Sequence, residues 1–324
     1  MNVNSSRLRK RIRDSILILF LVVLVVAFAI GSSGFLRPSN IVSILSNFSV
    51  LLILSLGISW VVMAGSLDIS QAGIAGLVGI LIGLILPVIG YGAIAVGILV
   101  GAGFGSLNGL IFTKARIPSF LVTLGTLFVT TGLEKYLAVT AHVLTNGIPI
   151  EGRLDVFLPT IPLLNVPRSF SLFYWAAGES ILFYMISQKT RFGLRIYAIG
   201  SSASSTLLYG INVTGYQVLV FALSGAISAV AGFLYLPYLN IASPTFTDSL
   251  TFVTLAAVVL GGTALAGGVG GFHRTVIGAL ILSIINNGLT VMGLDALALF
   301  VVQGVIIIIA AVAVSRGIKT GIIQ

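Results

Sequence analysis

One carboxylate stands out because polar residues surround it between two apolar runs that almost no loop separates. Asp68 lies in the segment Gly65-Ser66-Leu67-Asp68-Ile69-Ser70-Gln71. Unwound backbone at membrane depth occurs only where protein or a water-filled cavity surrounds it. We therefore expect a broken helix or re-entrant turn, and a polar solute path lined by Ser66, Asp68, Ser70 and Gln71. The alternative is that Asp68 caps the helix beginning near Ile69, and one residue can do both.

A second interruption lies at 260–271, with the sequence LGGTALAGGVGG. It follows Val258-Val259, much as the first interruption follows Val61-Val62. Corresponding breaks in two parts of a transporter point to its permeation route. A flexible glycine loop is the alternative interpretation.

Amides and hydroxyls inside other apolar runs are further candidates for the path. Asn286 and Asn287 lie in LILSIINNGLTVMGL, where an amide without partners costs free energy and is expected to face protein or water. Thr126, in a run with three other threonines, has the hydroxyl that a path for a hydroxylated solute would use. The alternative is that these threonines bond their own helix backbone.

Catalytic and cofactor signatures are absent from the sequence. It contains no GxxxxGK[ST] phosphate loop, HExxH or GxSxG motif, and no cysteine. His142 and His273 are too far apart in sequence to suggest a metal pair, and Glu134 and Glu179 form no recognisable proton relay. We therefore predict a protein that is not an enzyme, without catalytic residues, cofactor or metal.

The composition determines the fold class. Hydrophobic residues make up 57% of the chain, charged residues 8%, and the mean hydropathy is +1.16. Soluble domains are about one quarter charged. At about 20 residues for each crossing, we expect an all-α, polytopic membrane bundle of about ten spans, some interrupted. The expected spans are 16–30, 43–64, 70–89, 91–113, 118–138, 170–187, 215–237, 250–266, 275–291 and 296–315.

Basic residues indicate the orientation. Five cations lie in the first 14 residues, and the net charge of +9 is better explained by membrane orientation than by nucleic-acid binding. A cleaved signal peptide is the rival interpretation, but GSSGFLRPSN lacks a convincing cleavage site. We predict three parts: a cytoplasmic amino-terminal segment at 1–14, a transmembrane domain at 15–315 with a cytoplasmic segment at 188–214, and a cytoplasmic tail at 316–324.

Two glycine stripes and one long loop complete the pattern. Gly97-x-x-x-Gly101-x-x-x-Gly105 and the stripe from Gly73 to Gly83 predict close helix packing within the bundle, with a dimer interface as the alternative. The proline-rich loop at 140–169 predicts an irregular extracytoplasmic cap.

The segment from Gln188 to Val213 is the one long polar interruption with several cations and no acid. Within it, SSASSTLLYG at 201–210 has good helix-start chemistry at Ser201 or Ser202. We expect a short helix that fits a partner's groove, with a solvated loop as the alternative.

Several motifs in order resemble one protein family. TRFGLRIYAIG, LLYGINV, LSGAISAVAGFLY, TLAAVVLGGTALAGGVGG and IINNGLTVMGL are similar to motifs of the membrane subunits of bacterial ABC importers of the ribose, xylose, galactose and autoinducer-2 type. VVMAGSLDIS resembles the glycine-(isoleucine or leucine)-aspartate-leucine-serine element of that family. The resemblance covers about 43–315.

The resemblance implies partners and a docking element. The expected partners are a second permease subunit, cytosolic ATP-binding subunits, an extracytoplasmic solute-binding protein and membrane lipid, in the cytoplasmic (inner) membrane of a bacterium. The family's coupling element corresponds to the residues Gly200, Ser204, Ser205, Thr206 and Gly210. Where family members commonly carry an asparagine-glutamate-alanine-alanine run and an arginine, this chain has Ser202, Ala203, Ser204, Ser205 and Leu207. The missing charges suggest pairing with a different, more typical permease.

We therefore predict a permease subunit that passes a small polyhydroxylated solute, a monosaccharide, with energy from ATP bound elsewhere. The alternatives are an importer of nucleosides or autoinducer-2, a stand-alone secondary carrier, and a membrane scaffold or receptor that transports nothing.

Overall fold

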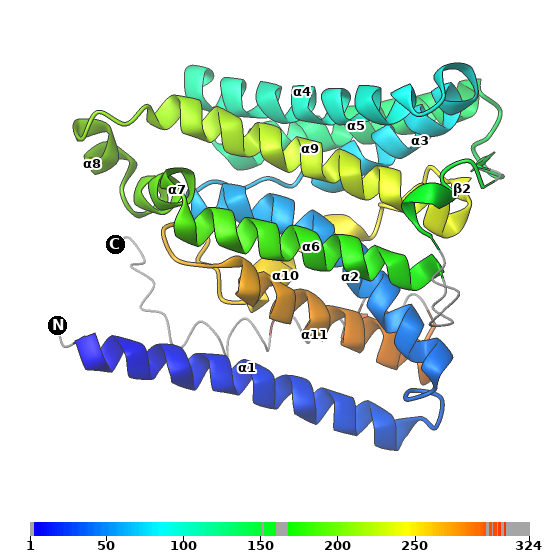
Figure 1. Cartoon of the computed structure of the whole chain (residues 1–324), viewed down its shortest axis with the longest axis horizontal. Helices are drawn as coiled ribbons and strands as arrows, with labels where there is room; N and C mark the ends of the chain where they lie inside the picture. Colours follow the sequence, from blue (N-terminus) through cyan, green and yellow to red (C-terminus); the bar gives the residue numbers. More distant parts are fainter. Residues whose placement is uncertain are drawn as a thin grey trace.

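The computed structural model describes residues 3–150, 152–159, 168–295, 298–299, 301–302, 304–305 and 308. Within these ranges the chain is almost entirely helical, as the composition predicts (Figure 1). The helices are α1 (Val3–Gly31), α2 (Pro38–Met63), α3 (Gln71–Ile89), α4 (Gly92–Ala115), α5 (Ser119–Thr140), α6 (Arg168–Lys189), α7 (Arg191–Ser201), α8 (Ala203–Leu208), α9 (Val213–Leu239), α10 (Leu250–Leu260) and α11 (Phe272–Val291).

A helix lies over every expected span up to 275–291. Among the described residues, α2, α3, α4, α9 and α11 are long and apolar enough to cross a membrane, while Leu17–Gly31 in α1 and α10 are shorter apolar helices. The expected span at 250–266 is wrong at its end. The helix stops at Leu260, and turns follow through Gly262, whose φ is +86°. The last expected span lies largely, and the tail at 316–324 wholly, outside the described residues.

Helix α9 lies at the centre of the bundle and packs against α2, α3 and α4. Glycines allow the closest of these contacts. A Cβ on Gly101 would collide with the backbone of Gly225, and a Cβ on Gly105 with the backbone of Phe221. The glycine stripe of α4 is therefore a packing seam within one subunit, as predicted.

The two ends of the bundle differ. Figure 1 shows α7, α8 and the beginning of α1 at one end. At the other end, β1 (Ile148–Pro149) pairs antiparallel with β2 (Ile241–Ala242). The short 3-10 helix η1 (Asp155–Phe157) follows β1 in the sequence. The basic residues of the segment predicted at 1–14 lie in the first part of α1, which begins at Val3.

Candidate functional site

Asp68 is fully buried in the unwound segment between α2 and α3. Its Oδ1 accepts hydrogen bonds from the Ser70 amide at 2.9 Å and the Ser70 hydroxyl at 2.6 Å. Its Oδ2 accepts a hydrogen bond from the Ser224 hydroxyl of α9 at 2.7 Å. Ser70 is the N-cap of α3 and has no side-chain cap hydrogen bond, so the bonds between Ser70 and Asp68 order the turn before the helix. The bond to Ser224 also ties this turn to α9.

The network continues into two more helices. Asn108 of α4 donates from Nδ2 to the Ser70 hydroxyl at 2.9 Å and accepts from the Thr126 hydroxyl of α5 at 2.5 Å. Buried polar networks stabilise one arrangement when their members are satisfied. The structure thus joins Asp68, Ser70 and Thr126 into one polar network shared by the unwound segment before α3 and by α4, α5 and α9.

Ser66 and Gln71 lie beside this network and are also buried. Gln71 donates from Nε2 to the Asp68 carbonyl at 2.9 Å. The Ser66 hydroxyl and Gln71 Oε1 have no hydrogen-bond partner among the described residues. A buried polar group without a hydrogen-bond partner costs free energy. The break therefore contains polar groups whose hydrogen-bonding capacity is not used in this conformation.

The Asn287 amide faces protein, one of the two environments predicted for it. Its side chain and that of Asn40 on α2 exchange two hydrogen bonds, at 2.8 and 2.9 Å. Asn40 also donates to the Phe35 carbonyl at 2.7 Å. The pair therefore locks α11 to the start of α2, away from the Asp68 network.

Asn286 lines a separate cavity of about 240 Å³ between α2, α9, α10 and α11. Asn47, Ser249 and Ser283 contribute other polar groups to the wall, and Tyr235 contributes a ring. The prediction that Asn286 faces protein or water agrees with this position. It does not join Asn287 or Asp68 in one site.

The two helix breaks meet each other and the segment predicted to couple with a partner. The Gly268 amide donates to the Met63 carbonyl at 3.0 Å. A Cβ on Gly267 would lie 2.5 Å from the Gly65 Cα and 2.9 Å from the Gly200 Cα. Three stretches of backbone therefore touch where only glycine fits, and we call Gly65, Gly200, Gly267 and Gly268 the glycine junction. The end of α7 is therefore in direct backbone contact with both breaks.

Side chains reinforce the contacts of α7. The Tyr197 hydroxyl donates to the Gly270 carbonyl at 3.4 Å, and burial raises the pKa of Tyr197, which keeps that donor protonated. Arg195 hydrogen-bonds the Tyr216 hydroxyl at the start of α9 and lies 5.5 Å from its ring centroid. Side chains of α7 therefore contact both the glycine-rich segment at 261–271 and α9.

Helix α8 forms at the predicted place. The Ser202 hydroxyl accepts from the Ser205 amide at 3.2 Å, which confirms the predicted helix start. Ser204, Ser205 and Gly210 are exposed, whereas Thr206 is buried and donates its hydroxyl to the Ser202 carbonyl at 2.8 Å.

The most prominent side chains of α8 and the turn after it are apolar. Leu207 is 61% exposed, Leu208 89% and Tyr209 86%. We call these three residues the α8 tip. Exposed apolar groups on a short rigid helix suit a hydrophobic groove on a partner.

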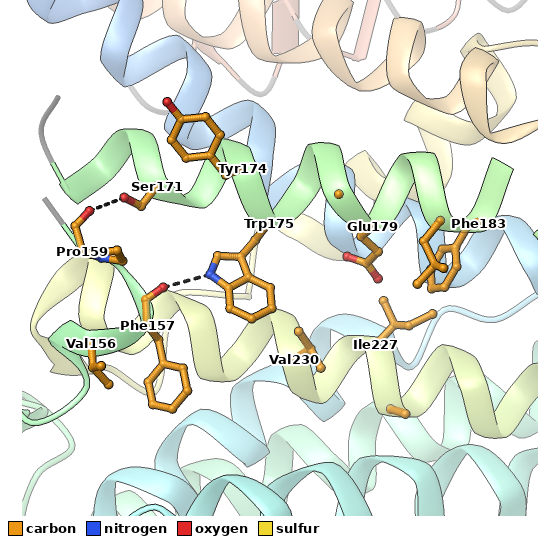
Figure 2. Close-up of a pocket in the computed structure, with 13 residues that line it drawn as sticks. Val156, Phe157, Pro159, Ser171, Tyr174, Trp175, Glu179, Phe183, Ile227 and Val230 are labelled. Carbon is orange, nitrogen blue, oxygen red and sulfur yellow. Dashed lines mark hydrogen bonds between the residues drawn. The ribbon is translucent and has the colours of Figure 1, made fainter. Parts of the chain in front are cut away.

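A cavity of about 740 Å³ lies between α6, α9 and the segment at 156–159 (Figure 2). Its wall is mostly apolar, with Glu179 contributing the carboxylate. Trp175 closes one side by donating from Nε1 to the Phe157 carbonyl at 2.8 Å. Because a polyhydroxylated solute needs several polar partners, this cavity is a poor site for one.

Three residues of these networks escaped the sequence analysis: Asn40, Asn108 and Ser224. Asn108 lies just after a glycine stripe, and Ser224 lies just before a glycine. In the sequence, both therefore look like positions where small residues allow close helix packing. An asparagine inside an apolar run was the available signal for Asn108, the same signal that singled out Asn286 and Asn287.

Comparisons with known proteins agree with this architecture. Residues 40–311 match the family model described as "Branched-chain amino acid transport system / permease component". The chain is 33% identical to the ribose import permease protein RbsC of Bacillus subtilis (strain 168), covering 90% of this chain and 89% of the relative. It is 28% identical to the xylose transport system permease protein XylH of Haemophilus influenzae (91% and 94% covered) and 30% identical to the galactose/methyl galactoside import permease protein MglC of the same organism (85% and 86%). The chain therefore belongs to the family of permease components of the branched-chain amino acid transport system type.

Proposed function

We propose that this protein is the permease subunit of an ATP-driven importer that carries a monosaccharide across the cytoplasmic membrane. The relatives named for ribose, xylose and galactose support the solute class. The observation that carries the proposal is the glycine junction, which connects the exposed α8 tip with both helix breaks.

ATP hydrolysis would take place in a separate subunit. The sequence has no phosphate loop, and the α8 tip offers an ATPase subunit an apolar docking element. Closing of a pair of ATPase subunits would push α8 and α7. Because Gly200 touches Gly65 and Gly267, this push would reach the segment that holds Asp68 and change how the helices around it pack.

The assembly would contain a second permease subunit and an extracytoplasmic solute-binding protein. The second permease is the same chain or a different one. The segment at 202–207 favours a different, more typical partner, because Ala203 and Leu207 stand where the family commonly carries charged side chains. The binding protein would dock at the end of the bundle that holds β1 and β2, opposite α8 (Figure 1).

Reconstitution tests the proposal. The chain is co-expressed with the ATPase, permease and binding-protein genes beside it, and the purified complex is placed in liposomes. We expect ATP-dependent uptake of at least one of D-ribose, D-xylose and D-galactose, and no uptake by the chain alone. Removing the α8 tip with Leu208→Ala and Tyr209→Ala should lower co-purification of the ATPase. Leu194→Ala on α7, at a residue 60% exposed, is the matched control.

Other outcomes would overturn the proposal in identifiable ways. Uptake by the chain alone would indicate a secondary carrier. ATP-dependent uptake of nucleosides or autoinducer-2, without uptake of any of the three sugars, would support an ATP-driven importer but contradict the proposed solute class. Absence of flux with every partner would indicate a scaffold or receptor.

A further inference from the structure

A groove runs along α3, α5 and the start of α10, and none of its lining residues belongs to the Asp68 network. Its volume is about 240 Å³, just below the roughly 300–1,000 Å³ of pockets for drug-sized ligands. Its wall combines Thr131, Thr247, Asp248 and Thr251 with Gly73, Leu127 and two phenylalanines. The rings of Phe128 and Phe252, 71% and 67% exposed, flank it.

The groove lies where a helix is interrupted. Helix α10 has 11 residues, which span about 16 Å, roughly half of the apolar core of a bilayer. In the turns at 244–249 before it, Thr247 is buried, and Asp248 lies beside Lys135 of α5. Interrupted helices at membrane depth are where transporters place polar contacts to their solutes.

Charged groups beside the groove have capacity for further hydrogen bonds. Lys135 and Asp248 lie 3.5 Å apart and are 46% and 45% exposed, so their pairing contributes little free energy and can rearrange. One turn beyond Thr131, Glu134 is fully buried, and neither carboxyl oxygen has a hydrogen-bond partner among the described residues. Its carboxyl packs on Gly76, where an added Cβ would lie 2.5 Å from Oε2.

A small solute with hydroxyl groups matches this set of side chains. The threonines and carboxylates bond hydroxyls, while the aromatic rings cover carbon-bound hydrogens. We propose that the groove lined by Thr131, Thr247, Asp248 and Thr251 is a subsite that contacts the transported monosaccharide, with Glu134, one turn beyond Thr131 on α5, as an additional acceptor. This inference rests on the proposed function, and it assigns a contact site to the solute.

Single cysteines test the location, because the chain has none of its own. Thr131→Cys and Phe252→Cys are made separately in the complete complex and labelled with a water-soluble thiol reagent. Thr140→Cys is the matched control, exposed on the same helix beyond the groove. We expect the transported sugar to slow labelling at residues 131 and 252 at least about threefold, as roughly two-thirds occupancy would do. The control should not change, and glycine betaine, an osmolyte without hydroxyls, should protect no position.

Glu134→Gln gives a second, independent measurement, with Glu179→Gln in the apolar cavity as its control. We expect the amount of sugar moved for each ATP hydrolysed to fall about fivefold or more for Glu134→Gln, because an amide oxygen is a weaker hydrogen-bond acceptor for the solute than a carboxylate oxygen. The control should keep the ratio of the unmodified complex.

Two results would overturn the subsite. The first is unprotected or absent labelling at residues 131 and 252 in a complex that transports the sugar. The second is an equal fall of uptake and ATP hydrolysis in Glu134→Gln, which would indicate a structural role. Failure of the unmodified complex to take up any monosaccharide would instead overturn the proposed function.

Discussion

At the scale of single residues, Asp68 holds the first break in place, since its carboxyl group accepts three hydrogen bonds. Asp68→Ala leaves the Ser70 amide and the hydroxyls of Ser70 and Ser224 without their acceptor. A buried donor without a partner costs about 1–3 kcal/mol. We expect a lower thermal unfolding midpoint in detergent and reduced ATP-dependent uptake, while the ATPase subunit still co-purifies.

Ser106→Ala is the control for this substitution, because the Ser106 hydroxyl donates to the Ala102 carbonyl of its own helix at 2.7 Å. It lies near Asn108 on α4 without belonging to the network. Unchanged uptake and unfolding in Asp68→Ala would show that Asp68 is a dispensable cap.

The Asn40–Asn287 pair allows a measurement of one contact between helices. Interhelical hydrogen bonds in membrane proteins average about 0.6 kcal/mol and reach about 1.7 kcal/mol in double-mutant cycles. We expect a coupling free energy in that range from Asn40→Ala, Asn287→Ala and the double variant, measured by unfolding in mild denaturing detergent. The same cycle with Asn286→Ala should give none, since Asn286 lines another cavity. If the effects of Asn40→Ala and Asn287→Ala are additive, the hydrogen bonds between the two side chains do not stabilise the fold.

At the scale of elements, the glycine junction connects α7 with the two breaks. Gly200→Ala places a methyl group against the Met63 carbonyl and the Gly268 amide, and overpacking of this kind costs about 1–3 kcal/mol. Because backbone cannot move aside as a side chain does, α7 must shift away from the breaks. We expect ATP hydrolysis that no longer drives uptake, measured on the same proteoliposomes.

Gly103→Ala on α4 is the matched control, because an added Cβ there meets nothing within 4 Å. It should leave uptake and hydrolysis unchanged. Uptake at the unmodified rate in Gly200→Ala would mean that the junction does not transmit movement.

The two helix breaks could be predicted from the sequence, but the contact between them and α7 could not. Clusters of glycine and polar residues interrupt the apolar runs at 64–70 and 261–271, so both breaks were visible in the sequence. That Gly65, Gly200 and Gly267 touch depends on contacts between distant segments, which no local pattern encodes. The end of α10 was misjudged because the hydropathy of Ala264 and Leu265 extends the apolar run, whereas Gly261 and Gly262 turn the backbone.

At the scale of the whole molecule, the polar candidates divide among separate places. Composition alone predicted the all-α bundle, because each apolar run must satisfy its backbone within a helix. The candidates were predicted as one path, but the structure distributes them among the Asp68 network, the Asn40–Asn287 pair and the cavity beside Asn286. A side chain's polarity shows that it needs a partner, but not which helix supplies it. Asn287 found its partner on α2 and Thr126 found its partner on α4.

The charges predict the orientation of the molecule, and this orientation can be measured directly. Most of the 17 basic residues belong to segments expected on one side, and α8 lies at the same end as the beginning of α1 (Figure 1). Tyr91, in the turn between α3 and α4, is 58% exposed, and the predicted parity of spans places it outside. In intact cells, a membrane-impermeant thiol reagent should label Tyr91→Cys and spare Ser204→Cys until the membrane is permeabilised. The reverse pattern would place the α8 tip outside the cell, where no cytosolic ATPase could reach it.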